Sequence, residues 1–462
     1  MLTYSLDPSR PMPLYQQLYR AILADLLSGA IAGGTRLPSR RALAEHLNVS
    51  RVTVEAAYGQ LLAEGYITSR PRSGYYAEQL ELHPLPEPIP HREPVLPLPT
   101  PPTASASHFP FSVWAKLMRT VLLDHRELLL LPPPNTGLSQ LRQAIAGLLH
   151  RSYGMNVSPD AIVIGAGAEY LYTILIQLLG RDLVYGLETP GHRKAWQVYE
   201  ANAVSPRPVS LDESGVCLSS LEQSGSNVLH ASPGHQFPTG IVMPITRRQQ
   251  QMSWLGGSQD RWLIEDNYDS EFRFSGRIIP SMFSMDTTGR VIYLNTFSKT
   301  ITPALRISYM VLPPALMQLY QAKLGFYSCT VPSFEQLTLA KFLDEGYFEK
   351  HVSRSKRRYR LLRDRLLELL RQSPLKHAVK ICGADAGLHF LLKLNPFADT
   401  AELQRRLAQA GIRAYSLSDF YHPPRTQSQE LLIQYSDLEE AELPRLVSLL
   451  EAMILGKETE GL

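Results

Sequence analysis

The chain has 462 residues, of which 44% are hydrophobic and 19% are charged, and this length predicts two or three globular domains rather than one. Its three cysteines, Cys217, Cys329 and Cys382, are too few and too scattered for a disulfide framework. They also lack metal-ligand spacing, so no metal site is expected. The sequence shows neither the layout of a signal peptide nor an uninterrupted apolar span, which predicts a cytoplasmic protein with no membrane segment.

The formal net charge of +3 is unevenly distributed. Residues 1–76 hold eight arginines, no lysine and five acidic residues, so the remainder of the chain is neutral on balance. A compact basic segment in front of a neutral body indicates contact with nucleic acid.

The N-terminal segment is predicted to form three short helices and a β-hairpin. Residues 12–28 carry leucine and isoleucine at helical spacing, which predicts a first amphipathic helix. Ser39 is a good N-cap for a second helix that ends at Asn48, and Ser50 for a third in SRVTVEAAYGQLLAEG. Alternation on both sides of a Pro-Arg-Ser-Gly turn over residues 66–76 predicts a hairpin wing.

The turn between the second and third predicted helices is so short that they form a helix-turn-helix, with the third as recognition helix. The N-terminal turn of that helix would face DNA, where Arg51 is long enough to reach a guanine edge. Ser50 and Thr53 offer short hydroxyls to phosphates, and Arg40 and Arg41, at the start of the preceding helix, suit the same partner. The alternative is that these arginines only solvate a small helical domain.

The run LPSRRALAEHLNVSRVTVEAAYGQLLAEGYI closely resembles the winged helix-turn-helix of GntR-type bacterial regulators. This resemblance covers about residues 12–77 and implies that residues 1–79 are a DNA-binding domain. It places the following residues where that family touches DNA, with Arg72 beside them in the wing: Arg41, Ser50, Arg51, Thr53 and Gly74.

Residues 80–107 change character, with nine prolines between Pro84 and Pro102. Such a segment holds neither a helix nor a central strand, and it predicts an extended, semi-rigid spacer of roughly 3 Å per residue. A Pro-rich ligand for a third protein is the alternative. The spacer would join the DNA-binding domain to a second body, residues 108–462.

Residues 108–462 show the alternation of strands and helices that is typical of an α/β fold, followed by a smaller α+β half. We expect a large part over about residues 108–334 and a small part over about 335–462. Helices are predicted at Val113–Leu123, Leu138–Arg151, Glu335–Glu345 and Tyr347–Arg371. Strands are predicted at Ala161–Ile164, Leu183–Tyr185, Val228–Ala231, Trp262–Ile264, Val291–Leu294, Ile307–Leu312, Gly387–Leu394 and Leu431–Tyr435.

The stretch RVIYLNTFSKTITPALRISYM places Lys299 on a short turn between two apolar runs, and Arg306 opens the second run. A lysine that is partly desolvated there has a lowered pKa and can condense with a carbonyl. Arginine is the residue type that clamps a phosphate bidentately. Together they suggest pyridoxal 5′-phosphate (PLP) held as an internal aldimine. The alternative is a solvated loop lysine and an ion-paired arginine.

Further sites add to this pair. The strand before GAGAE leads into a helix whose backbone at Ala168 and Glu169 would seat a phosphate. Asp266 ends a buried strand, where a carboxylate can keep a pyridine nitrogen protonated. Tyr268 would reach the phenolic oxygen of the ring, and His192, after a Pro-Gly turn, would stack on it. The alternatives are a turn-capping acid, with Asp269 as competitor, and a surface histidine.

Read together, these sites resemble fold-type I PLP enzymes, the aspartate aminotransferase group, over about residues 108–455. With the loop SPGHQFPTG and the winged helix in front, the whole chain resembles the MocR subgroup of GntR-family transcriptional regulators. The resemblance implies that Lys299 forms the aldimine, that Asp266 meets the pyridine nitrogen and that Tyr268 meets the ring oxygen. It implies His192 at a place usually filled by Tyr, and a phosphate held by Thr296, Ser298, Arg306 and the backbone at Ala168 and Glu169.

Besides His192, two further positions depart from the enzyme pattern. Phe237 stands where the enzymes usually carry Asn, which leaves His235 and Gln236 to reach the ring oxygen. Leu432 stands where aminotransferases place the arginine that binds the substrate carboxylate, with Arg425 or Arg413 as substitutes. The second departure argues against efficient transamination.

The favoured hypothesis is therefore a PLP-dependent, DNA-binding transcriptional regulator that senses PLP or an amino compound through aldimine formation at Lys299. It would act as a homodimer on an operator with repeated half-sites. One alternative is a PLP-dependent aminotransferase with an accessory DNA-binding domain. Another is a DNA-binding protein whose large domain is only a dimerisation platform.

Overall fold

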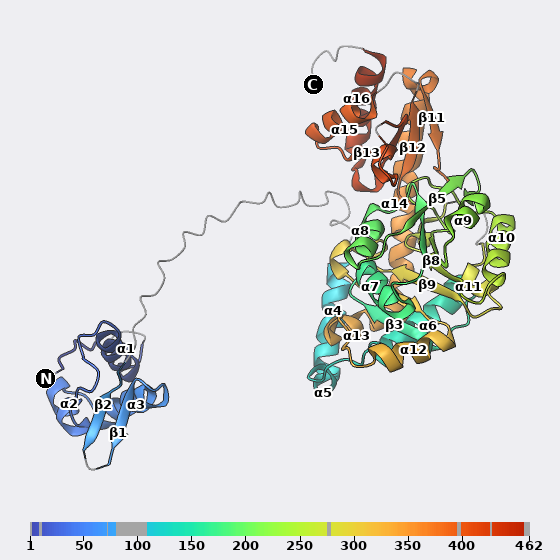
Figure 1. Cartoon of the computed structure of the whole chain (residues 1–462). Coiled ribbons are helices and arrows are strands. Elements are labelled where there is room, and N and C mark those ends of the chain that lie inside the picture. Colours follow the sequence, from blue (N-terminus) through green and yellow to red (C-terminus); the bar gives the residue numbers. More distant parts are fainter. Residues whose placement is uncertain are drawn as a thin grey trace. The chain divides into compact units, whose positions relative to one another are not determined.

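The computed structural model describes residues 2–8, 12–71, 73–79, 109–274, 279–394, 399–425 and 427–456. The chain divides into two compact units, Met1–Pro97 and Leu98–Leu462, and each is described by itself. Figure 1 labels the helices and strands of both units. The predicted Pro-rich spacer and Arg72 lie outside the described residues.

The first unit forms the predicted three helices and hairpin. Its elements are α1 (Leu14–Leu27), α2 (Arg40–Leu47), α3 (Arg51–Ala63), β1 (Ile67–Arg70) and β2 (Gly74–Ala77). Ser39 Oγ accepts a hydrogen bond from the N–H of Ala42, and Ser50 Oγ accepts one from the N–H of Thr53, each at 3.1 Å. These caps fix the starts of α2 and α3. The three helices and the hairpin share one apolar core, which includes Leu18, Leu43, Val54, Leu61 and Ile67.

The second unit is organised around an eight-stranded sheet in the order β3-β10-β9-β8-β7-β4-β5-β6. Its strands are β3 (Ile162–Gly165), β4 (Tyr185–Thr189), β5 (Arg207–Asp212), β6 (Gly215–Val216), β7 (Val228–Ala231), β8 (Trp262–Asp266), β9 (Val291–Thr296) and β10 (Ser308–Val311). β10 lies antiparallel between β3 and β9, and β6 is antiparallel to β5 at one end of the sheet. The other neighbouring strands are parallel.

Helices cover both faces of this sheet (Figure 1). They are α4 (Phe111–Asp124), α5 (Arg126–Leu129), α6 (Ser139–Tyr153), α7 (Ala168–Leu179), α8 (Arg193–Ala201), α9 (Leu218–Ser224), α10 (Ile245–Gly256), α11 (Met282–Met285), α12 (Pro314–Leu324) and α13 (Ser333–Asp344). Successive side chains of a strand point to opposite faces. Ile292 and Leu294 therefore join a core with α7, α8 and α12, whereas Tyr293 joins a core with α6 and α13.

The small part has an antiparallel four-stranded sheet in the order β11-β12-β14-β13. Its elements are β11 (Val379–Cys382), β12 (Phe390–Leu394), α15 (Thr400–Gln409), β13 (Ala414–Ser416), β14 (Glu430–Ile433) and α16 (Leu443–Leu455). The long helix α14 (Tyr347–Gln372) joins the two parts of this unit (Figure 1). Phe348 near its start belongs to a core of the large part, and Leu362 and Leu366 belong to the core of the small part.

The predicted elements agree with these bounds to within a few residues, with two differences. β5, β6, β11 and β13 were not expected. β6 and β13 have only two and three residues, β11 has no fully buried side chain, and β5 is mostly exposed and contains a proline. α13 packs in a core of the large part through Leu339 and Phe342. The division expected near residue 335 therefore falls within α14. Among the described helices, none is both long and apolar enough to span a membrane.

A fully buried arginine holds the loop that leads from β7 toward α10. Arg248 is 1% exposed and donates to three backbone carbonyls, those of Met243 (3.1 Å), Pro280 (2.8 Å) and Pro233 (2.6 Å). Since the loop carries residues 232–240 of the candidate site, this guanidinium helps to fix the position of that site.

We predict that Arg248→Met lowers the free energy of unfolding of the second unit by at least about 3 kcal/mol, because three buried carbonyls lose their donor. All four tryptophans, Trp114, Trp196, Trp254 and Trp262, lie in that unit, so tryptophan fluorescence during urea unfolding reports on it alone. Gln250→Met, at an exposed position of the same helix, is the control. Equal unfolding midpoints for the two variants would contradict this role of Arg248.

Candidate cofactor site and DNA-binding surface

The residues predicted to hold a cofactor gather at one edge of the large sheet. β3, β4, β7, β8 and β9 run in the same direction, so their carboxyl ends meet there. β8 ends at Asp266, and β9 ends at Thr296 just before the turn that carries Lys299. β10 runs the opposite way, so Arg306, just ahead of its first residue, lies at the same edge. Open α/β sheets meet their ligands at this edge.

Asp266 is a buried carboxylate that other side chains keep ionised. Its Oδ2 accepts a 2.5 Å hydrogen bond from Tyr172 Oη and lies 3.4 Å from His230 Nε2. Burial alone would raise the pKa of Asp266, but His230 and then Tyr172 outweigh it and the pKa is lowered. Tyr199 Oη lies 3.2 Å from His230 Nδ1 and extends this network. Asp266 can therefore offer a fixed negative charge to a protonated ring nitrogen.

Tyr268 stands beside a second buried acid. Its Oη lies 3.1 Å from His235 Nδ1, which in turn lies 2.9 Å from Asp269 Oδ2. Burial, and then the charge of Asp269, raise the pKa of Tyr268 well above its ordinary value. The phenol therefore keeps its proton and can donate a hydrogen bond. Asp269, the competitor of Asp266, is thus engaged with His235 rather than with the network at the end of β8.

His192 presents a neutral, flat ring to the site. It is the N-cap residue of α8, and it stacks on Phe237 with ring centroids 4.3 Å apart and planes inclined by 18°. Its ring also meets that of Tyr268 edge-on at 5.3 Å. Burial lowers the pKa of His192 to about 4, and the Lys299 ammonium adds to this lowering against the opposing charge of Asp266. The structure thus brings His192, Tyr268 and Phe237 into contact and places Asp266 and Lys299 within electrostatic reach.

Lys299 is exposed, which corrects the expected partial desolvation. The reason is its position beside a cavity of about 230 Å³ whose walls come from the turn after β9, from α14 and from the small part. Arg413, Gln434 and Ser436 line the same cavity. The lysine therefore faces a space that both parts of the second unit enclose.

The segment predicted to bind a phosphate forms the start of α7. Gly167 has φ +96°, and a Cβ there would lie 2.2 Å from an Arg306 nitrogen, so only glycine lets this guanidinium approach the helix. Arg306 donates to Glu169 Oε2 at 2.5 Å and to Ala166 O at 3.4 Å. Burial would raise the pKa of Glu169, but the bond from Arg306 lowers it overall. The first N–H groups of a helix, here at Ala168 and Glu169, have no intrahelical acceptor and favour an anion.

Of the two hydroxyls predicted for the phosphate, one has bonding capacity left. Ser298 Oγ is buried and has no hydrogen-bond partner among the described residues. Thr296 Oγ1 accepts from Ser298 N–H (3.1 Å) and from Ser308 Oγ (2.8 Å) and donates to Ile307 O (3.4 Å). A hydroxyl has one donor and two acceptor positions, so Thr296 holds the turn in this structure instead of facing the phosphate seat.

The loop of residues 232–240 is fixed by a buried acid that sequence reasoning missed. Glu188, 7% exposed, accepts from the N–H of Ser232 (3.2 Å) and from Gln236 Nε2 (3.3 Å). Burial raises the pKa of Glu188 to about 8 in spite of these bonds. Gln236 also bonds Pro190 O and Thr239. Gln236 is therefore engaged in bonds within and around this loop. Of the two residues predicted to reach the ring oxygen, His235 contacts Tyr268.

The two departures from the enzyme pattern lie in one apolar cluster. Leu432 is fully buried with Leu391 and Leu417, and Phe237 packs against them. Neither position can bind a carboxylate. Of the proposed substitutes, Arg413 lines the cavity beside Lys299, with its NH1 3.9 Å from Asp437 Oδ2. Arg425 instead lies over the Tyr421 ring, 3.7 Å from its centroid.

The predicted DNA contacts lie on the starts of α2 and α3. Arg51 is exposed at the first position of α3. Arg41 is exposed and bonded to Glu45 at 2.8 Å. Arg40 differs from the expectation, because it forms an ion pair with Glu55 of α3 and lies near the Tyr75 ring. A phosphate contact by Arg40 would have to replace that ion pair.

The remaining predicted contacts have structural roles as well. Ser50 and Thr53 pair their hydroxyls at 2.8 Å while Ser50 caps α3. Gly74 starts β2 with φ +107°, a backbone conformation that residues other than glycine rarely adopt. Arg36 lies beside it, 3.6 Å from where a Cβ would stand. The wing is thus a tight hairpin whose turn requires a glycine.

Three residues at the cofactor edge had a weak signal in the sequence. His230 is a polar residue within the buried run Val228–Ala231, and Tyr172 lies one helical turn after the predicted phosphate seat. Glu188 precedes the Pro-Gly turn that had already singled out His192. Their partners come from other strands, so their roles follow only from the order of the strands.

The donor set fits PLP. Ionised Asp266, the protonated phenol of Tyr268, the Arg306 guanidinium and the unpartnered Ser298 hydroxyl offer a counter-charge, a donor and two anion-binding groups at the sheet edge that leads to Lys299. An exposed Lys299 and an ion-paired Arg306, each taken alone, also match the alternative of a solvated lysine and a paired arginine. That alternative does not account for a buried ionised acid at the same edge. Within the described ranges, no group of three or more His, Cys, Asp or Glu is arranged to hold a metal ion.

Comparison with known proteins assigns both units. Residues 14–76 match the gntR family of bacterial regulatory proteins, and residues 101–450 match the aminotransferase class I and II family. The HTH-type transcriptional regulator YdeL of Bacillus subtilis is 37% identical over 92% of this chain and 93% of its own length. The probable rhizopine catabolism regulatory protein MocR of Rhizobium meliloti is 30% identical over 99% and 97%. The HTH-type pyridoxine biosynthesis transcriptional regulator PdxR of Corynebacterium glutamicum is 30% identical over 91% of each chain.

The second unit also has the fold of solved aminotransferases. Kynurenine aminotransferase of Pyrococcus horikoshii superposes with a TM-score of 0.69 at 23% identity, over 78% of this chain and 90% of that one. These matches define a DNA-binding transcriptional regulator that carries a fold-type I aminotransferase-like domain. Within that class, the chain belongs to the MocR-like subfamily of GntR regulators. The fold and family predicted from the sequence are thereby confirmed.

We predict that Glu188→Gln changes how stability depends on pH. A carboxyl whose pKa rises to about 8 on folding makes the free energy of unfolding fall as pH increases from about 4.5 to about 8, by roughly 1.4 kcal/mol per pH unit. An amide does not titrate, so the variant should gain stability relative to the natural protein across that range. Urea unfolding followed by tryptophan fluorescence at several pH values measures the difference.

Glu222→Gln, at an exposed position of α9, is the control and should leave the pH dependence unchanged. A constant difference between Glu188→Gln and the natural protein from about pH 5 to about pH 8 would show that Glu188 is ionised in the folded state.

Proposed function

We propose that this regulator binds PLP through Lys299 and that the small molecule alters its affinity for DNA. The observation that carries the proposal is the ionised, buried Asp266 at the same sheet edge as Lys299 and Arg306. Keeping a carboxylate charged in a protein interior costs free energy. In this protein Tyr172 and His230 stabilise the charge of Asp266. The protonated ring nitrogen of PLP would form an ion pair with this carboxylate.

Each residue then has a stated role. Bound PLP supplies an aldehyde that reacts with amines and a ring that accepts electrons. Lys299 would carry the covalent link, Asp266 would hold the ring nitrogen protonated, and Tyr268, backed by His235, would donate to the ring oxygen. His192 would stack on the ring. Arg306, Ser298 and the N–H groups at Ala168 and Glu169 would bind the phosphate.

A sensing role is favoured over transamination. In the enzymes that the chain resembles, an arginine binds the substrate carboxylate where Leu432 stands here, and Leu432 fills an apolar cluster with Phe237 instead. An amino acid therefore cannot be oriented in the usual way. The second candidate, a PLP-dependent aminotransferase with an accessory DNA-binding domain, would need Arg413 to replace that arginine. Arg413 does line the cavity beside Lys299, so amine binding remains part of the proposal.

The signal is PLP itself or an amino compound that reacts with it. The name of the relative PdxR refers to pyridoxine biosynthesis, and that of MocR refers to rhizopine catabolism. The names of the relatives therefore do not favour one kind of signal. Visible spectra recorded while amines are added to the PLP-bound protein separate the two. A change of spectrum that is accompanied by a change of operator affinity identifies an amine as the signal.

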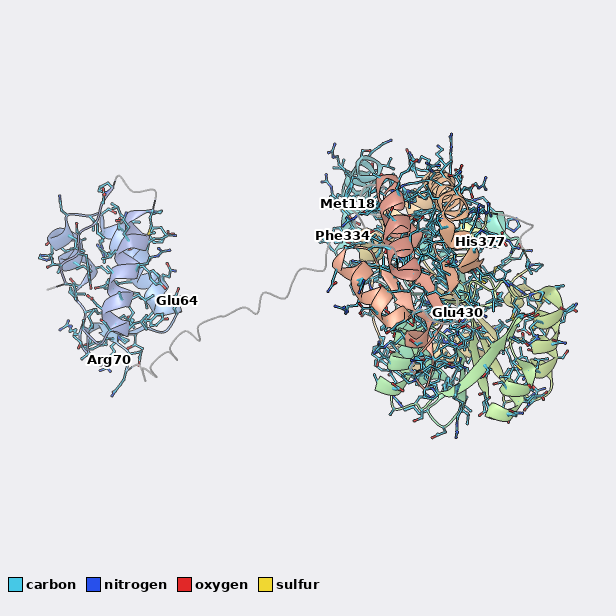
Figure 2. All side chains as sticks on the ribbon, turned by 90° about the horizontal axis from the view of Figure 1, so that it is seen from above. Glu64, Arg70, Met118, Phe334, His377 and Glu430 are labelled. Carbon is cyan, nitrogen blue, oxygen red and sulfur yellow. The ribbon has the colours of Figure 1, made fainter. Side chains whose placement is uncertain are left out.

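We also propose a cytoplasmic homodimer that binds repeated operator half-sites. Large apolar side chains are exposed on α4, on α13 and in the segments after α5 and α12; they include Leu123, Leu130 (85% exposed), Leu131, Phe326 (77%) and Phe334. Figure 2 labels Met118 of α4 and Phe334 of α13, two helices that pack against each other. Such a surface is typical of a protein interface. A dimer would present two winged helices to two half-sites.

We predict that the purified protein mixed with PLP is yellow and that Lys299→Ala abolishes its visible band, because the amine that forms the covalent link is gone. Lys323→Ala, at an exposed position of α12, is the matched control and should keep the band. Absorbance spectra before and after borohydride reduction provide the measurement. If Lys299→Ala kept a reducible adduct, another lysine would be the attachment site.

A further inference from the structure

The recognition helix α3 exposes an apolar side chain at its first turn. Val52 is 72% exposed, whereas Val54, two residues on, is 0% exposed and belongs to the core of the unit. Arg51 precedes Val52 and is also exposed. The outer face of the first turn therefore carries one long basic side chain and one short branched apolar one.

The next turn continues this apolar strip. Ala56 follows Val52 by one helical turn and is exposed, so the two side chains lie on one face. Glu55, the other exposed residue of this turn, is tied to Arg40 by an ion pair. The carboxylate of Glu55 is thus paired with α2, and Val52 and Ala56 are the exposed apolar side chains of the strip.

Burial of Val52 against a partner would contribute a favourable free energy, because its methyl groups would be removed from water. The major groove of DNA contains one apolar group that matches it, the 5-methyl of thymine, whereas the other base edges present hydrogen-bonding groups. Because Arg51 beside it is suited to the O6 and N7 of guanine, the first turn of α3 combines a reader for each of two bases.

We propose that Val52 is a specificity residue that contacts a thymine methyl in each operator half-site, next to a guanine contacted by Arg51. The proposal rests on the DNA-binding function of the chain and adds to it the chemistry of one base. The face of α3 excludes a second polar reader at this point, since Ala56 has no hydrogen-bonding group in its side chain. A pyrimidine without the methyl group should therefore be bound less well at that position.

The test uses the full-length protein and begins with duplexes selected from a random library for tight binding. Each thymine of the selected site is then replaced in turn by uracil, which removes only the methyl group. For the natural protein, one replacement in each half-site should lower affinity roughly fourfold, as the loss of one buried methyl group predicts. Binding is measured by fluorescence anisotropy at one fixed salt concentration.

Variants of Val52 complete the cycle. Val52→Ser should bind the thymine duplex about as weakly as the natural protein binds the uracil duplex, and should show no preference between them. Val52→Ile retains an apolar branched side chain and should keep the preference. Because Val52 is exposed, neither variant disturbs the core, and equal binding to a random-sequence duplex at low salt confirms an intact domain.

Two results would overturn the proposal while leaving the regulator function in place. In the first, no thymine-to-uracil replacement changes the affinity of the natural protein. In the second, Val52→Ser keeps the full preference for thymine, which would assign the methyl contact to another residue or Val52 to a contact within the protein. Failure of the natural protein to select any duplex would instead count against its DNA-binding function.

Discussion

The cofactor edge of this protein depends on one buried charge. Asp266 is held ionised by His230 and Tyr172, and Glu188, whose pKa is raised by burial and by the charge of Asp266, is kept neutral. Two ionised carboxylates in this interior would repel each other and raise the cost of folding. Glu188 still accepts hydrogen bonds from Ser232 N–H and Gln236 Nε2 of the loop that carries His235.

That loop connects the charge at the sheet edge to the small part of the unit. His235 lies against Gly387, where a Cβ would be 1.9 Å from the imidazole. His389 Nε2 lies 3.1 Å from Pro238 O. The cavity beside Lys299 is enclosed by both parts as well. A molecule that binds there touches both parts of the unit, and it would shift their arrangement only through different affinities for the alternatives.

Most of the architecture could be predicted from the sequence, because buried strands and capped helices leave local signals. Ser39 and Ser50 predicted the starts of two helices, and the apolar run before Asp266 predicted a central strand. Interactions between distant segments could not be predicted: Tyr172 and His230 reach Asp266 only because of the strand order β9-β8-β7. The exposure of Lys299, the saturated hydroxyl of Thr296 and the ion pair of Arg40 likewise depend on partners far away in the chain.

The central claim is that PLP at Lys299 changes how the protein binds DNA. The most direct measurement is the affinity of the full-length protein for one selected operator duplex, with and without PLP, for the natural protein and Lys299→Ala. The account predicts a PLP-dependent change of roughly 5–150-fold, the usual range of coupling between two sites, and its loss in Lys299→Ala. Equal affinities in all four cases would contradict the claim and leave the aminotransferase-like domain as a platform for dimerisation.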